Sequence, residues 1–211
     1  MLEIVTLILG PLDTNTYLIA DPETNAAAVI DPAWDAPLIA SAAGQRHWQI
    51  SQLWITHAHF DHIGAAADLA RALDGLPVIA LHPDDRALWE ARGGAEHFGF
   101  SLPASPAPAL PLAQDLPLHL GGIPFKVLHT PGHTPGHCIF YCEQAGVCFC
   151  GDLIFKDSVG RTDLPGGDWG SLVESIRSQV YALPGDTRLL PGHGPGTTVE
   201  EEMNGNPFVR A

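Results

Sequence analysis

Four side chains of types that commonly bind metals lie within one short stretch, Thr56–His62, which reads THAHFDH. Three are imidazoles, those of His57, His59 and His62, and the fourth is the carboxylate of Asp61. In an extended segment His57 and His59 point to the same side, whereas a helix would turn them to nearly opposite faces. A polar loop with solvated histidines explains one or two such residues but explains four poorly. The stretch therefore indicates a metal site.

The flanking sequence puts this stretch at the end of a strand. Residues 52–56 are apolar and β-prone, as in a buried strand, and residues 64–73 are rich in alanine and leucine, as in a helix. A cluster between a strand and a helix lies at the carboxyl end of the strand, which is where open α/β sheets bind ligands.

Three further candidate ligands, His133, Asp152 and His193, follow other hydrophobic strands, and each comes directly after a glycine. Glycine permits backbone geometry that is closed to other residues and allows chain segments to approach a shared point. With the first cluster they make five imidazoles and two carboxylates, a set that suits zinc, iron or manganese rather than calcium or magnesium. Seven ligands are too many for one four-coordinate zinc ion. We therefore expect two divalent ions, zinc before iron or manganese, that share a bridging carboxylate.

Length and charge restrict the other possibilities. The 211 residues, 45% of them hydrophobic, suit one domain that spans residues 1–211. A net charge of −14 argues against nucleic acid or an anionic membrane surface as a partner. Glu3 stands where a signal peptide needs a basic region, and there is no long apolar run, so we expect a cytoplasmic protein.

Four cysteines lie close together, at positions 138, 142, 148 and 150. Their C-x3-C and C-x-C spacings do not fit a zinc ribbon, which needs C-x2-C pairs. We expect them to be small buried side chains of core strands, without disulfides.

The remaining elements alternate strands with a few helices. Strands are expected over residues 2–9, 16–20, 26–30, 77–81, 125–129, 138–142, 146–150 and 188–191, and helices over 36–44, 83–92 and 172–183. Residues 10–15 should turn between the first two strands of an antiparallel meander, and the proline-rich segment 99–117 should be an extended surface loop. Both halves place strands before a metal-type loop, which favours a two-sheet sandwich with outer helices.

The combined pattern, T-H-x-H-x-D-H followed by G-H, G-D and G-H, resembles the metallo-β-lactamase superfamily. The segment Gly151–Asp168 and the ending Gly205–Phe208 are similar to the short, single-domain hydroxyacylglutathione hydrolases, the compact type of glyoxalase II. The resemblance implies an α/β (α+β) fold, a four-layer αββα sandwich of two mixed β-sheets flanked by helices, with the metals at one edge.

The resemblance also implies a role for each candidate ligand. The positions that match the first ion's ligands are His57, His59 and His133, and those that match the second ion's are Asp61, His62 and His193. Asp152 matches the carboxylate that bridges the two ions, and Asp61 and Asp152 count as catalytic as well as ligating.

The implied activity is hydrolysis of a thioester, most simply S-lactoylglutathione to lactate and glutathione. Water on such a metal pair has its pKa lowered to about 7, so a hydroxide can attack the carbonyl at neutral pH. The expected partner is this small molecule, with no nucleic acid and no membrane, for a monomer or small homo-oligomer.

Substrate binding and support of the ligands depend on other residues. The carboxylates of glutathione call for Arg161, which stands where longer glyoxalase II proteins carry a lysine, and for Lys156. An ion pair of Arg161 with Asp163 or Asp168 is an equally good reading. His137 and Asp31 are expected to hold ligating side chains in place, although Asp31 could instead cap a turn.

Two other activities remain open. A persulfide dioxygenase of the same superfamily would use a single iron at the positions matching His57, His133 and Asp152. A metal-binding module without turnover is the second alternative, although the complete ligand set speaks against it. A β-lactamase fits less well, because lactamases lack the bridging carboxylate that Asp152 matches.

Overall fold

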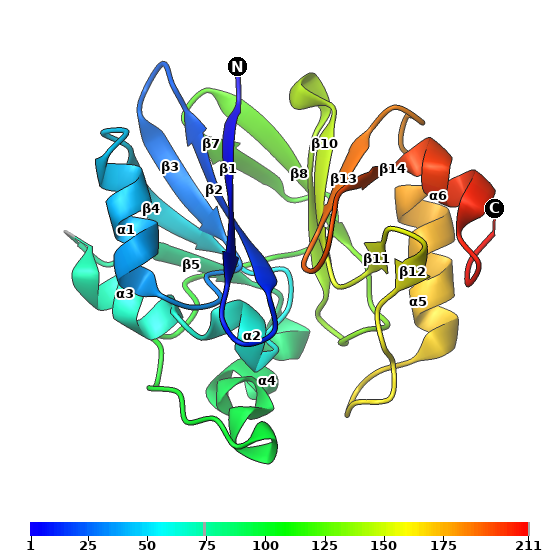
Figure 1. The fold of residues 1–211 in the computed structure, drawn as a ribbon, viewed down its shortest axis with the longest axis horizontal. Coiled ribbons are helices and arrows are strands. Elements are labelled where there is room, and N and C mark those ends of the chain that lie inside the picture. The colour runs from blue at the N-terminus through cyan, green and yellow to red at the C-terminus, as the bar shows by residue number, and fades with distance from the viewer. Residues whose placement is uncertain (74, 211) are drawn as a thin grey trace.

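The chain folds into two large sheets that face each other, as Figure 1 shows, and the computed structural model describes residues 1–73 and 75–210. Within these ranges the first sheet has six strands, in the spatial order β1 (Glu3–Leu9), β2 (Thr14–Asp21), β3 (Ala26–Ile30), β4 (Gln49–Trp54), β5 (Val78–Leu81) and β6 (Leu110–Pro111). The strands β1, β2 and β3 form the expected antiparallel meander, and β3 to β6 run parallel.

The second sheet is also mixed. In the described residues its order is β14 (Thr197–Thr198), β13 (Arg188–Pro191), β10 (Val147–Gly151), β9 (Cys138–Cys142), β8 (Ile123–His129) and β7 (Pro117–Leu120). Only β10 and β13 are parallel among the described pairs of this sheet. A small separate hairpin, β11 (Ile154–Phe155) and β12 (Ser158–Val159), follows β10.

Helices cover the outer face of each sheet (Figure 1). The first sheet is covered by α1 (Ala36–Gly44) and α3 (Ala66–Ala72), and the second by α5 (Trp169–Ser175), the π-helical turn η4 (Ile176–Val180) and α6 (Val199–Gly205). Short helical turns lie in the connections: α2 (Phe60–Ile63), η1 (Pro83–Asp85), α4 (Arg86–Glu90), η2 (Arg92–Phe98) and η3 (Glu143–Ala145). The predicted four-layer αββα sandwich is confirmed.

Strand periodicity divides the core into three layers. In β2, Leu18 faces the outer helices, whereas Tyr17 and Ile19 face the opposite sheet. Between the sheets Tyr17 and Phe149 meet edge to face, with ring centroids 5.1 Å apart. Because the central strands are buried on both faces, they read as nearly continuous apolar runs. The resulting frame holds the strand ends, and the loops that follow them, in fixed positions.

The predicted cysteine environment is confirmed. All four cysteines are free and buried: Cys138 and Cys142 of β9 lie in the layer between the sheets, and Cys148 and Cys150 of β10 lie in the layer under the outer helices. None of the helices in the described residues has the length and apolar character needed to cross a membrane.

Several element boundaries differ from the prediction. The strand predicted at residue 16 begins at Thr14, because Thr14 and Asn15 pair with β1 instead of turning. The histidine loop contains the helical turn α2, too short to show a helical period. The proline-rich segment adds the two-residue strand β6 beside β5, and Trp89 of α4 donates to the carbonyl of Pro106 at 3.2 Å.

Two predicted helices are also shaped differently. The one expected over 83–92 is a 3-10 turn followed by α4, which ends at Glu90 ahead of Gly93 and its positive φ. The one expected over 172–183 begins at Trp169, because the Asp168 carboxylate accepts a hydrogen bond from the amide of Ser171 at 2.7 Å. Asp168 is thus a helix cap rather than a partner of Arg161.

Candidate metal centre

The seven predicted ligands meet at one edge of the sandwich, where strands of both sheets end. The stretch that contains His57 follows β4 of the first sheet. His133, Asp152 and His193 follow β8, β10 and β13 of the second sheet. The carboxyl ends of strands from opposite sheets therefore supply one shared site.

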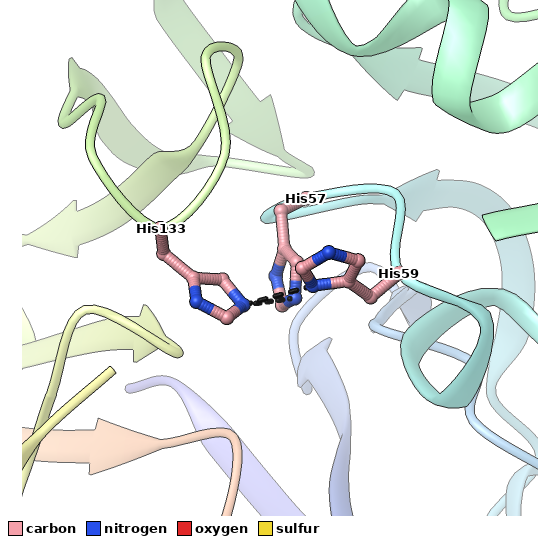
Figure 2. Close-up of side chains that lie close together, drawn as sticks. All are labelled: His57, His59 and His133. Carbon is pink, nitrogen blue, oxygen red and sulfur yellow. Dashed lines mark hydrogen bonds between the residues drawn. The ribbon is translucent and has the colours of Figure 1, made fainter. Parts of the chain in front are cut away.

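Three imidazoles converge in the first group of ligands, as Figure 2 shows for His57, His59 and His133. Nδ1 of His59 lies 2.9 Å from Nε2 of His133, which lies 3.2 Å from Nε2 of His57. Two ligands of one tetrahedral zinc ion, each about 2.0–2.1 Å from the metal, lie about 3.3–3.4 Å apart. The spacing of these nitrogens is therefore close to that of three ligands on one ion.

The second group contains Asp61, His62 and His193. Oδ2 of Asp61 lies 3.2 Å from Nε2 of His193 and 3.6 Å from Nε2 of His62. The carboxylate of Asp152 lies between the groups: it is 3.3 Å from His62, 3.6 Å from His193 and 3.7 Å from His133. Asp152 thus contacts ligands of both groups.

Three buried side-chain atoms lack a hydrogen bond within the described residues: Nε2 of His137 and, between the two groups, Nε2 of His62 and Oδ1 of Asp152. Buried polar atoms without partners are uncommon in proteins, so each calls for an explanation. A cation between His62 and Asp152 would satisfy the atoms of both, and imidazole and carboxylate are suitable donors for a divalent transition metal. The residues present therefore fit a pair of such ions.

In four of the five candidate histidine ligands, a hydrogen bond at the second ring nitrogen sets the orientation of the ring. Nδ1 of His62 donates to Oδ2 of Asp31 at 2.9 Å, and Nδ1 of His57 donates to Oγ1 of Thr56 at 3.0 Å. The Thr56 hydroxyl in turn donates to Asp31 at 2.6 Å. For the neutral rings these partners assign the tautomer in which Nε2 keeps a lone pair for a metal. Asp31 therefore supports ligating residues, as one of its two expected roles required.

Backbone carbonyls orient the rings of His133 and His193. Nδ1 of His133 donates to the carbonyl of Arg161 at 2.7 Å, and Nδ1 of His193 donates to the carbonyl of Leu12 at 3.0 Å. In each case Nε2 again faces the centre.

The electrostatics of the site favour metal binding. Burial, reinforced by neighbouring histidines, lowers the pKa of His57 well below its ordinary value and that of His59 to about 3. Burial also acts to lower the pKa of His62, but the carboxylates of Asp152 and Asp61 outweigh it and raise that pKa well above the ordinary value. The first group therefore offers neutral imidazoles at neutral pH, whereas a metal in the second group must displace a proton.

Comparison with known proteins decides the family. The model of the metallo-beta-lactamase superfamily matches residues 9–193. The chain belongs to this superfamily. It is 36% identical to a protein described as "Hydroxyacylglutathione hydrolase GloC" of Haemophilus influenzae, over 93% of both chains. Superfamily membership and these ligand groups together support a metal-dependent hydrolase.

Two solved structures are similar along the whole chain. One, described as BLEG-1 B3 metallo-beta-lactamase, has a TM-score of 0.91 at 34% identity and covers 100% of both chains. The other, described as TTHA1623 in a di-iron-bound form, has a TM-score of 0.88 at 40% identity and covers 97% of this chain and 100% of that one.

The candidate substrate residues of this superfamily member lie on exposed loops. The guanidinium of Arg161 makes two hydrogen bonds to the carboxylate of Asp163, at 2.6 and 2.7 Å, so the structure contains the ion pair that was the alternative reading. The contact of Arg161 with the centre is made by its carbonyl group. Lys156 is exposed at the turn between β11 and β12.

His137 is buried against the centre but does not hydrogen-bond to a ligand. Its Nδ1 lies 2.8 Å from the hydroxyl of Thr130, and its ring centroid lies 5.2 Å from that of His57. Its contact with His57 is therefore one of packing, and its supporting role stays a prediction.

Sequence reasoning missed the contribution of the β1–β2 hairpin. The hydroxyl of Thr14 donates to Asp61 at 3.3 Å, and the side-chain amide of Asn15 donates to the carbonyls of Pro191 and Gly194, both at 2.9 Å. The hairpin thus holds the His193 loop. Two polar residues at the start of an otherwise apolar strand were the available signal.

A further group, His82, Asp84 and His129, also places possible ligand atoms within 4.8 Å of one another. However, the two imidazole rings stack with centroids 4.0 Å apart and an interplanar angle of 8°. An imidazole lone pair lies in the plane of its ring, so parallel stacked rings cannot both direct a nitrogen at one ion. We interpret this group as a stacking contact.

Proposed function

We propose that this chain is a metal-dependent thioester hydrolase, and specifically a hydroxyacylglutathione hydrolase that converts S-lactoylglutathione to lactate and glutathione. One observation supports this most strongly: all seven ligand positions are filled and Asp152 contacts both groups, in a chain similar over most of its length to a GloC protein. A degenerate, non-catalytic relative has no need of the complete set.

The seven candidate ligands would hold two metal ions. The first ion would be held by His57, His59 and His133, the second by Asp61, His62 and His193, and both by Asp152. When bound, such ions supply a hydroxide nucleophile at neutral pH and the positive charge that polarises the thioester carbonyl.

The two carboxylates would act as ligands rather than as proton donors. Burial raises the pKa of Asp61 and of Asp152, but the neighbouring histidines outweigh it and hold both pKa values below the ordinary range. No strong general acid is needed, because a thiol with a pKa of about 8.5 leaves readily as the thiolate.

For the metal pair we propose zinc, with iron and manganese as alternatives that the ligand types also allow. The di-iron form of TTHA1623 supports iron. We further infer a cytoplasmic location, because four free buried thiols are typical of a reducing compartment.

For the substrate we propose that Lys156 and Arg161 bind the carboxylates of the glutathione part. Asp163 occupies Nε and Nη2 of Arg161, so a substrate carboxylate would use the remaining N–H donors or compete with that ion pair.

The deciding experiment measures metal content and S-lactoylglutathione hydrolysis on one purified sample. We expect about two ions per chain and turnover that disappears with a chelator and returns with metal. Two bound ions without thioester hydrolysis would contradict the proposal.

Similarity to BLEG-1 favours β-lactam hydrolysis as a second candidate, since both reactions transfer an acyl group to water. A chromogenic cephalosporin tested on the same sample separates the two activities. Oxygen uptake with glutathione persulfide tests the dioxygenase alternative, which also requires a single iron.

A further inference from the structure

We propose that Asp85 is a positioning residue that sets the distance between the two loops carrying the ligands of the first ion. Asp85 lies in η1, after β5, and belongs to none of the ligand motifs. This inference rests on the proposed two-metal site, because it assigns a role to a residue that supports it.

A single carboxylate joins the two loops. Oδ2 of Asp85 accepts hydrogen bonds from the amide of Ala58 at 2.9 Å and from the hydroxyl of Thr134 at 2.8 Å. Oδ1 accepts one from the amide of Gly136 at 2.7 Å. Ala58 lies between His57 and His59, whereas Thr134 and Gly136 lie in the loop after β8. Asp85 therefore links the end of one sheet to the end of the other.

The geometry leaves Asp85 little freedom. Its side chain is fully buried and all three donors are neutral groups, so the carboxylate depends on them to offset its desolvation. A β-carbon added to Gly136 would lie 2.6 Å from the backbone nitrogen of Asp85 and 2.7 Å from Oδ1. The loop can approach the carboxylate this closely only with glycine at position 136.

The linked loops carry three nitrogens that lie close together. Nε2 of His133 is 2.9 Å from His59 and 3.2 Å from His57, so a small shift of either loop would separate the ligands of the first ion. Among the second group, His62 is oriented by Asp31 and His193 by Leu12. Loss of Asp85 should therefore weaken the first ion more than the second.

The test replaces Asp85 in the full chain and measures the affinity of both zinc ions by chelator competition. For Asp85→Ala and Asp85→Asn we expect the first ion to weaken by about 10-fold to 100-fold, the usual effect of losing a residue that supports a metal ligand. Asparagine fails because its NH₂ group must face a donor, whichever way the amide is turned. Thr134→Ser, which keeps the hydroxyl, should restore nearly normal affinity relative to Thr134→Val.

Glu202 offers a matched control. It is a buried carboxylate that accepts hydrogen bonds from Thr197, Asn206 and the amide of Asp157, on α6 and outside the ligand loops. Glu202→Gln should lower stability without changing the affinity of either ion. If it weakened the first ion as much as Asp85→Asn does, the effect would be one of general stability and the inference would be wrong.

A second readout does not depend on metal. In the metal-free protein, the amides of Ala58 and Gly136 should exchange with solvent faster in Asp85→Asn than in wild type, whereas amides near Glu202 should not. Unchanged exchange together with unchanged zinc affinity would overturn the inference. If wild type bound no ions, the proposed function would fail, and the amide exchange would still test the link itself. Asp85→Asn and Thr134→Val supply the result if Asp85→Ala does not fold.

Discussion

The residues around the centre act mainly by fixing which ring nitrogen faces it. In four of the five ligating histidines Nδ1 donates to a protein oxygen, and only His59 turns Nδ1 inward. Two of the four acceptors are backbone carbonyls, those of Arg161 and Leu12. Such partners hold the ring orientation before any metal arrives, which lowers the entropy lost on binding.

At this scale the clearest prediction concerns Asp152. Asp152→Ala removes the carboxylate that contacts both ligand groups and leaves His62 Nε2 facing an empty buried space. We expect metal content to fall below two ions and thioester hydrolysis to fall by more than about 100-fold, more than the loss of a supporting residue would cause. Elemental analysis and a thioesterase assay check this. Full retention of both would exclude a bridging role.

A second prediction at this scale concerns the Arg161–Asp163 ion pair. The hydrogen bonds from Arg161 lower the pKa of Asp163 to about 2, so the carboxylate is charged at neutral pH and can pair with Arg161. Asp163→Asn should free Arg161 and lower KM for S-lactoylglutathione. Solvent screens an exposed ion pair strongly, so KM should fall by no more than about fivefold, with kcat unchanged.

Steady-state kinetics between about pH 6 and 8, where the carboxylates of glutathione are charged, measure this effect. Lys156→Ala serves as the opposite variant and should raise KM. An unchanged KM in Asp163→Asn would mean that the substrate does not contact Arg161.

At the scale of elements, the His133 loop is held against the N-terminal end of α5. Gly132 has a φ of 139°, and a β-carbon there would lie 2.3 Å from the backbone nitrogen of Leu172. The carbonyl of Gly132 accepts a hydrogen bond from the amide of Asp168 at 2.8 Å. Helix and loop therefore share one backbone contact that only glycine permits.

Gly132→Ala should destabilise the protein by about 2–5 kcal/mol, the sum of backbone strain and steric overlap. Gly146 is a matched control, because it also has a positive φ but nothing lies within 4 Å of a β-carbon there. Gly146→Ala should cost only about 1 kcal/mol. Urea unfolding compares the two variants, and equal losses would mean that the contact with Leu172 is not the cause.

The strands were predictable because they are apolar, β-prone runs bounded by turn residues, and three of them, residues 26–30, 138–142 and 188–191, have the predicted bounds. The predictions that failed concern short segments. The turn α2 has four residues, fewer than a helical period needs to show, and Thr14 and Asn15 resemble turn residues until β1 pairs with them. Pairing partners are set by tertiary structure, which local propensity does not encode.

For the site, the sequence predicted the ligating side chains better than their support. Histidine and aspartate after a strand leave a visible pattern, and the structure brings all seven together. The carbonyl of Leu12 leaves no pattern in the sequence, because every residue supplies a carbonyl. The hydrogen bond from His193 to Leu12 also spans 181 positions. Asp85 lies within an ordinary Pro-Asp-Asp turn, and its sequence context does not indicate its contacts with the two ligand loops.

At the scale of the whole molecule, the centre joins two halves that are otherwise held by the core between the sheets. His57 comes from the first sheet, and His133, Asp152 and His193 come from the second. Near the centre, two backbone hydrogen bonds already join the two sheets, from the amide of Cys138 to the carbonyl of Thr56 and from the amide of Asn15 to the carbonyl of Gly192. Bound ions would add a cross-link whose ligands lie up to 136 positions apart, from His57 to His193.

Removal of metal should therefore lower the thermal stability of the whole fold. An ion present at 100 times its dissociation constant contributes about 2.7 kcal/mol to the native state, so two such ions contribute about 5 kcal/mol. For a chain of this length that corresponds to a fall in Tm of about 10–20 °C on chelation. Calorimetry should show one cooperative transition with and without metal, because the core between the sheets joins the two halves in either state. Asp152→Ala is the control and should respond less to the chelator. Separate melting of the two halves in the loaded protein, or an unchanged Tm on chelation, would mean that the ions do not link the sheets.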